Sequence, residues 1–472
     1  MSPEPSNSTQ EQAVAGSSRI PIVRAGYLYR ISLIATMGGF IFGYDLDIII
    51  GALLFVRREF HFTPMQLGLA VSSAAFGCIL GPLLGGSISD RLGRKKTLAI
   101  TALVFALGTI GTVVPRNAAE FDFARFIGGL GVGLASVVSP MYISEIAPSH
   151  LRGRLVTVNQ LAIMVGALLS IVVAYVLSFT AGWRMMFASE LLPVAVFLVG
   201  LTVMPESPRW LLCNNRLSQA RDVLRRIYDP LSAERELHLI RASIGENQVR
   251  LKELLAPGLR RALLIGITLA MLQQFTGVSP IISYMPIIFQ EAGFNSPSAA
   301  ILQTVIVMTW SFLWTLVAFW LVDRAGRRPL LLTGTLGMGT GMFLMGLSFE
   351  LKFPGIWVVA IMMLSMAFYV TSLAPLTWLI MSEIFPTRLR GRAMAVSSAF
   401  LWLANFASTQ TLPSLSAFMQ KRFGSTTGVF WLFALVCAGA FLFAWRFVPE
   451  TKGRSLEEIG ESWQSSADPL QV

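Results

Sequence analysis

The sequence predicts an all-α membrane protein with twelve transmembrane helices, arranged as two pseudo-symmetric six-helix bundles. Two observations carry this prediction. The 472 residues are 54% hydrophobic and only 13% charged, with a mean hydropathy of +0.64, so the chain is far more apolar than a typical water-soluble protein. In addition, its basic motifs occur twice, in the same order, in the two halves of the chain.

Twelve segments are long enough to cross a bilayer, which takes about 20 apolar residues in a helix. They cover residues 29–55, 64–89, 97–115, 119–144, 155–178, 184–204, 261–291, 298–322, 329–349, 355–383, 392–416 and 426–449. The charge spacing of the polar gap after the sixth segment predicts short amphipathic helices. The predicted order is a disordered cytoplasmic N-terminus at 1–27, a bundle at 28–204, a cytoplasmic linker at 205–260, a second bundle at 261–449 and a cytoplasmic tail at 450–472.

Three charged motifs at the ends of the predicted helices are duplicated, at offsets of 233, 238 and 244 residues. Since acidic and basic residues alternate in them, they can form an ion-pair network that latches the two bundles together and breaks when they part. Simple anchoring of the helix ends at the membrane surface is the alternative. The predicted gate residues are Asp90, Arg91, Arg94, Glu145, Arg154, Glu206, Asp323, Arg327, Glu383, Arg392 and Glu450.

The net charge of +11 reflects orientation in the membrane. With both termini in the cytoplasm, 29 of the 37 Lys and Arg residues fall in cytoplasmic segments, seven fall in external segments, and Arg125 lies within a span. This asymmetry follows the positive-inside rule, so nucleic acid is not an expected partner. The lean chain and its short loops favour a multi-pass monomer in the lipid bilayer of a bacterial inner membrane.

An enzyme is not expected. The sequence offers no nucleophile with a base and no phosphate-binding loop, and its three cysteines lack the spacing of metal ligands. We therefore expect no metal and no cofactor.

Ionisable residues within the spans are few, and each costs roughly 2.5–3.5 kcal/mol to insert, so each needs a reason. Asp45 in the first span and Arg125 in the fourth can neutralise each other, and protonation of Asp45 would release Arg125. We favour such a proton-coupling pair over a static salt bridge. Glu190 in the sixth span is either a second relay carboxylate or a structural partner, and Asp47 has no assigned role.

Polar and aromatic residues within the spans predict a binding site between the bundles. Amides donate and accept hydrogen bonds, and indole rings pack on the C–H face of a sugar, so together they suit a ligand rich in hydroxyl groups. Each of them alone could instead hold neighbouring helices together. The candidates are Gln160, Gln273, Gln274, Trp378, Trp402 and Asn405.

The chain resembles the sugar porter family of the major facilitator superfamily over about residues 28–460. The resemblance rests on Gly43-Tyr44-Asp45, Asp90-Arg91-Leu92-Gly93-Arg94, Pro205-Glu206-Ser207-Pro208-Arg209, Gln273-Gln274-Phe275 and Pro449-Glu450-Thr451-Lys452-Gly453. The stretches Ser139–Glu145 and Trp402–Asn405 look like those of bacterial proton–xylose symporters. The resemblance implies that Asp45 is the proton-coupling acid, with Arg125 as its partner. It also implies that Gln160, Gln273, Gln274, Trp378 and Trp402 bind the sugar and that Phe42 lines the site.

This sequence departs from the family pattern in the second half of the predicted pocket. Ser279 stands where the family usually has Asn, and Leu401, Ser311 and Ser283 also replace more polar or larger residues. The pocket is therefore expected to be wider and less polar, which leaves open a sugar other than glucose or xylose, a polyol such as inositol, or a bulkier glycoside. The expected function is proton-coupled sugar or polyol symport by alternating access. The rivals are a passive facilitator and a transporter-like nutrient sensor.

Overall fold

The computed structural model describes residues 23–179, 182–243, 259–385, 389–450 and 452, apart from the side chains of Ser243, Phe319 and Asp323. Within these ranges the secondary structure is helical, apart from one isolated β-bridge between Val23 and Tyr228. The first bundle contains α2 (Ala25–Phe60), α3 (Pro64–Leu92), α4 (Arg94–Val113), α5 (Ala118–Ile146), α6 (Ser149–Leu177), α7 (Trp183–Ala188) and α8 (Leu191–Val203). The first helix thus begins slightly earlier than the predicted boundary.

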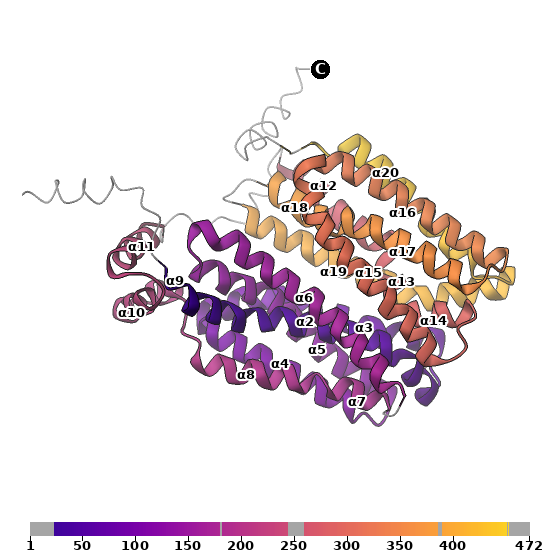
Figure 1. The fold of residues 1–472 in the computed structure, drawn as a ribbon, viewed down its shortest axis with the longest axis horizontal. Coiled ribbons are helices and arrows are strands. Elements are labelled where there is room, and N and C mark those ends of the chain that lie inside the picture. Colours follow the sequence, from indigo (N-terminus) through magenta and orange to yellow (C-terminus); the bar gives the residue numbers. More distant parts are fainter. Residues whose placement is uncertain (1–22, 180–181, 244–258, 386–388, 451, 453–472) are drawn as a thin grey trace, which may run out of the picture.

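The linker forms α9 (Pro208–Cys213), α10 (Leu217–Ile227) and α11 (Pro230–Ser243). The second bundle contains α12 (Leu259–Phe275), α13 (Val278–Ser283), α14 (Met285–Glu291), α15 (Pro297–Ala325), α16 (Arg327–Glu350), α17 (Gly355–Thr371), α18 (Leu373–Ile384), α19 (Arg390–Phe423) and α20 (Thr427–Phe447). Figure 1 shows the two bundles side by side, with the linker helices at one end of the first bundle. We call this end the linker end and the opposite one the far end.

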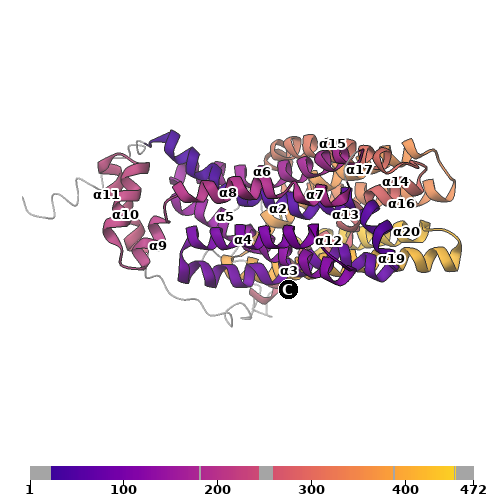
Figure 2. The same ribbon diagram turned by 90° about the horizontal axis from the view of Figure 1, so that it is seen from below.

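The chain runs along the long dimension of the molecule, between the linker end and the far end, twelve times. This count takes α7–α8, α12–α14 and α17–α18 as one crossing each. Eleven of these crossings are long and apolar enough to span a membrane. The twelfth, α19, has 34 residues and is long enough, but its amides and hydroxyl residues lower its hydropathy. Figure 2, turned by 90°, shows the helices of both bundles running roughly parallel to this dimension, as expected for a membrane protein.

Glycines allow the closest helix crossings in the first bundle. A Cβ added to Gly129 of α5 would lie 1.9 Å from the carbonyl oxygen of Ala74 in α3, and one added to Gly43 of α2 would lie 1.9 Å from the carbonyl oxygen of Ile163 in α6. No side chain fits at these distances. Gly129 therefore belongs to a face of α5 on which helices pack closely.

The seventh span is broken, although its hydropathy predicts one continuous helix over 261–291. Gly277 has a φ of 89°, a left-handed conformation that favours glycine, and it separates α12 from α13. A second break follows at Tyr284, just before Pro286 at the start of α14. The break at Gly277 lies three residues after Gln274, next to the predicted binding site.

Candidate functional site

Asp45 and Arg125 meet in the interior of the first bundle. Nη1 of Arg125 lies 3.2 Å from Oδ1 of Asp45 and also donates to its backbone carbonyl at 2.9 Å. The side chains are only 4% and 1% exposed, so water cannot substitute for either partner. Gly128 makes room for the pair, since a Cβ there would lie 2.9 Å from Oδ1 of Asp45.

The pair is incompletely satisfied. Oδ2 of Asp45 and the Nε and Nη2 atoms of Arg125 are buried without a hydrogen-bond partner among the described residues. Glu190, between α7 and α8, is fully buried and interacts electrostatically with both residues. Its carboxylate lies near Thr109, but that hydroxyl donates to the carbonyl of Phe105, and neither oxygen of Glu190 has a hydrogen-bond partner in the described structure. Three ionisable groups thus share one buried cluster with spare bonding capacity.

Asp47 is half-buried and lies within electrostatic reach of Arg125. It adds a third carboxylate, beside those of Asp45 and Glu190, to the surroundings of the same guanidinium. The sequence had assigned it no role.

The predicted substrate residues of α12 and α19 lie together. Nδ2 of Asn405 donates to Oε1 of Gln274 at 2.9 Å, and Nε2 of Gln273 donates to the backbone carbonyls of Leu373 and Ala374 at 3.1 and 3.3 Å. Leu373 and Ala374 begin α18, directly after the break at Ser372. Oε1 of Gln273 is buried and has no partner in the described part of the chain, so it can accept a bond from a ligand.

Two rings close the site from opposite bundles. Phe42 of α2 and Trp402 of α19 have ring centroids 6.2 Å apart. Gln160 and Trp378 are exposed, and neither is joined to the other candidates by a hydrogen bond or ring contact between described residues. Tyr369 of α17 was missed by the sequence analysis, although it lies close to both Gln273 and Ser279. A lone tyrosine in an apolar span was the available signal.

The duplicated motifs form the same structure twice, once in each bundle. Arg94 holds Glu145 through two hydrogen bonds of 2.9 Å and also pairs with Asp90 at 3.1 Å, while Arg327 pairs with Glu383 at 3.0 Å. Glu206 accepts from the backbone N–H groups of Arg94 and Lys95, and Glu450 accepts from those of Arg327 and Arg328. Gly93 and Gly326, with φ of 96° and 89°, make the tight turns that present these N–H groups.

Among the described residues, the ion pairs of Arg94 and Arg327 each fall within one bundle. Arg91, Arg154 and Arg392 are exposed and form no ion pair with another described residue, and the side chain of Asp323 lies outside the described residues. At the far end, by contrast, polar contacts cross between the bundles. Ser72 donates to Gln410 at 2.8 Å, Gln410 donates to the carbonyl of Met65 at 3.0 Å, and the hydroxyls of Ser178 and Ser298 lie 2.9 Å apart.

Comparison with known proteins decides the family, because the model of the "Sugar (and other) transporter" family matches residues 31–463. The chain belongs to the sugar porter family of the major facilitator superfamily. This sugar porter is 38% identical to the D-xylose-proton symporter of Escherichia coli, over 95% of its own length and 98% of the relative. It is also 38% identical to the major myo-inositol transporter of Bacillus subtilis, over 93% and 95% of the two chains.

The fold agrees with this membership. This sugar porter matches the inward-open conformation of the xylose transporter from E. coli with a TM-score of 0.81 and 36% identity, over 93% of this chain and 100% of that chain. The predicted fold class and the resemblance to proton–xylose symporters are therefore confirmed. The relatives are membrane transporters and not enzymes.

Proposed function

We propose that this sugar porter is a symporter that couples inward proton flow to the uptake of a sugar or polyol by alternating access. The observation that carries the proposal is the buried Asp45–Arg125 pair, held at 3.2 Å beside a third ionisable group. A buried ion pair adds little stability compared with well-packed apolar residues, so its presence in the interior favours a functional role.

We assign the linker end to the cytoplasm, with both termini inside and the far end outside. The clustering of Lys and Arg at the linker end supports this orientation. With polar contacts between the bundles at the far end and the gate ion pairs within single bundles, the conformation corresponds to a carrier open toward the cytoplasm. In the opposite state, the exposed gate arginines are available to pair across the bundles as the inner latch.

The coupling cycle follows from the geometry of the pair. A proton that neutralises Asp45 removes the partner of Arg125, whose free guanidinium then turns to Glu190, the nearby carboxylate with unused acceptor oxygens. That change biases the first bundle toward closure around the bound substrate. Each proton that enters supplies about 2.3 kcal/mol per 100 mV of membrane potential, which drives accumulation.

The substrate is placed between the bundles, at Gln273, Gln274 and Trp402. The unpaired Oε1 of Gln273 and the paired amides of Gln274 and Asn405 provide acceptors and donors for hydroxyl groups. Phe42 and Trp402 come from different bundles. A sugar ring that packs on both side chains therefore contacts both bundles and favours their closure. Ser279 beside Tyr369 leaves space for a substrate that differs from xylose. We assign this carrier to a bacterial inner membrane as a monomer.

The experiment uses purified protein in proteoliposomes and compares the native chain with Asp45→Asn. The native protein should alkalinise the outer medium when the transported sugar is added, and should accumulate that sugar under an imposed pH gradient. Asp45→Asn should lose both while retaining sugar exchange. Uptake insensitive to a protonophore in the native protein would instead identify a passive facilitator, and binding without flux would identify a sensor.

A further inference from the structure

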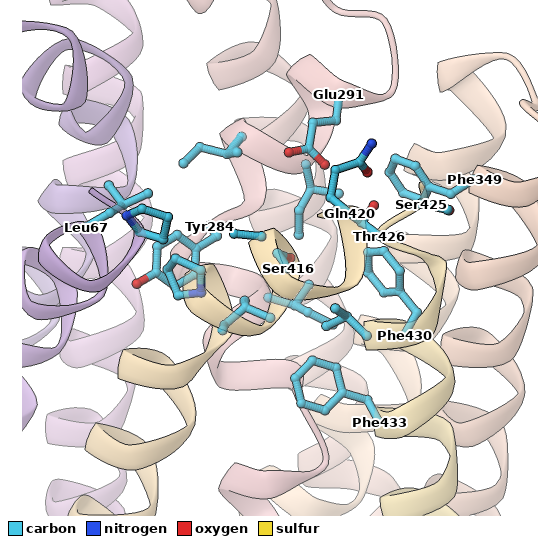
Figure 3. Close-up of a pocket in the computed structure, with 18 of the residues that line it drawn as sticks. Leu67, Tyr284, Glu291, Phe349, Ser416, Gln420, Ser425, Thr426, Phe430 and Phe433 are labelled. Carbon is cyan, nitrogen blue, oxygen red and sulfur yellow. The ribbon is translucent and has the colours of Figure 1, made fainter. Parts of the chain in front are cut away.

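A second cavity opens at the far end, away from the proposed substrate site. It has a volume of about 580 Å³, within the usual range for small-molecule sites. Figure 3 shows its walls, formed by residues near the far ends of α13, α14, α16, α19 and α20, with Leu67 of α3 facing them from the first bundle. None of Phe42, Gln273, Gln274 or Trp402 lines it. The cavity is therefore not part of the central site.

The cavity carries opposite charges from the two bundles. Arg57 belongs to α2 in the first bundle and Glu291 to α14 in the second, and the two attract each other across the cavity. Arg57 and Glu291 are too far apart to form a direct ion pair with each other. Neither side chain, nor that of Ser416, has a hydrogen-bond partner in the described part of the chain. A ligand with several hydroxyl groups can donate to Glu291, accept from Arg57 and bond Ser416.

The opposite wall is aromatic. The rings of Phe349 and Phe430 stack at 5.3 Å with an interplanar angle of 10°, and Phe433 continues this surface. Phe433 also packs against the hinge of the broken helix, because a Cβ on Gly277 would lie 2.3 Å from its ring. An occupant that contacts these rings is thereby connected to the break between α12 and α13.

We propose that this cavity is an external effector site that takes a glycoside with an aromatic aglycone. The sugar hydroxyls bond Arg57, Glu291 and Ser416, and the aglycone packs on Phe430 and Phe433. The charge pair has no net charge, which suits a neutral ligand. Because its groups come from both bundles, the site is complete only while the far ends are together. By linkage, its ligand stabilises the conformation open to the cytoplasm and inhibits uptake from outside. This consequence rests on the proposed alternating access, whereas binding itself does not.

The test uses the full chain in lipid nanodiscs, with phenyl β-D-glucoside as the probe and calorimetry as the readout. Ser416→Phe fills the cavity and should weaken probe binding by at least about tenfold, a change easily resolved. Glu291→Gln removes the charged acceptor and should also weaken binding. Lys421→Ala, next to the cavity-lining Gln420 but not itself lining the cavity, is the matched control and should bind the probe as the native chain does. Trp402→Ala, in the central site, should also leave probe binding intact.

Transport gives the second readout. Added outside, the probe should lower the maximal rate of sugar uptake without changing KM, and Ser416→Phe should remove this inhibition. The proposal is overturned if the native chain does not bind the probe, if Trp402→Ala abolishes binding while Ser416→Phe leaves it unchanged, or if the inhibition is competitive. If Asp45→Asn kept proton-coupled accumulation, the coupling proposal would fail while the binding result would stand, so the two proposals fail separately.

Discussion

A single methyl group added at Gly128 should uncouple sugar transport from proton flow without unfolding the protein. In Gly128→Ala the new Cβ would lie 2.9 Å from Oδ1 of Asp45, whereas ordinary contacts begin at about 3.4 Å. The carboxylate oxygen must therefore retreat by about 0.5 Å. The atom that moves is the end of a side chain, so the new methyl group itself adds little strain to the fold.

The functional cost is larger, because the displaced oxygen is the one that pairs with Arg125 at 3.2 Å. A separation of about 3.7 Å exceeds hydrogen-bonding distance, which forfeits about 1.5–3 kcal/mol for a bond to a charged group. With an effective dielectric constant of about 20, the Coulomb attraction also falls by about 0.7 kcal/mol. A loss of about 2 kcal/mol corresponds to a roughly thirtyfold smaller preference for the paired state.

The assay is sugar accumulation under a pH gradient, alongside sugar exchange and the thermal unfolding midpoint. Gly128→Ala should lose most accumulation, while exchange stays near the native value and the midpoint falls by only a few degrees. Gly86→Ala, with nothing within 4 Å of its new Cβ, should change none of the three. Gly129→Ala forces a Cβ to 1.9 Å from a backbone oxygen and should fold poorly. Native accumulation by a folded Gly128→Ala protein would refute the assigned role of the pair.

Three further predictions concern other parts of the carrier. Glu206→Gln weakens the charged acceptor at the start of α4 and should lower stability by about 1 kcal/mol, seen as a lower unfolding midpoint; an unchanged midpoint would contradict the capping role. Trp402→Ala removes the ring that meets Phe42 and should raise the Kd for the transported sugar at least about tenfold in calorimetry, and native affinity would place the substrate elsewhere. Gln410→Ala removes two hydrogen bonds across the far end, about 1 kcal/mol each, and should open that end. A cysteine introduced at Ser72 should then react faster with an external thiol reagent than it does in a background that retains Gln410.

The sequence was most informative about charged residues within the spans, because their insertion into the membrane costs free energy. Asp45 and Arg125 stand out as opposite charges within spans, and pairing is the simplest way to keep both there, so their 3.2 Å contact could be anticipated. The second motif copies were equally visible, because the repeat places Arg327 where Arg94 stands in the first half. Arg94 binds Glu145, and Arg327 binds Glu383, the corresponding acid of the second copy.

Other features depend on tertiary geometry that hydropathy does not encode. The break at Gly277 cannot be recognised in a continuous apolar run, and the ring of Phe433 that lies where a Cβ would be comes from a distant part of the chain. The sequence indicated Glu206 as a partner for arginines, but in the fold it accepts bonds from the backbone N–H groups at the start of α4. Nothing next to Gln410 or Tyr369 in the sequence indicates a partner, and only the packing of α19 on α3 and of α17 on α12–α13 provides one.

The measurement that bears most directly on the central claim is the charge moved when sugar is added to reconstituted protein on a solid-supported membrane at neutral pH. The native chain should give an inward positive current that grows with the sugar concentration. Asp45→Asn should give no current, although it still exchanges labelled sugar across the bilayer. A native-sized current from that variant would show that the proton enters by another group and that the Asp45–Arg125 pair is only structural.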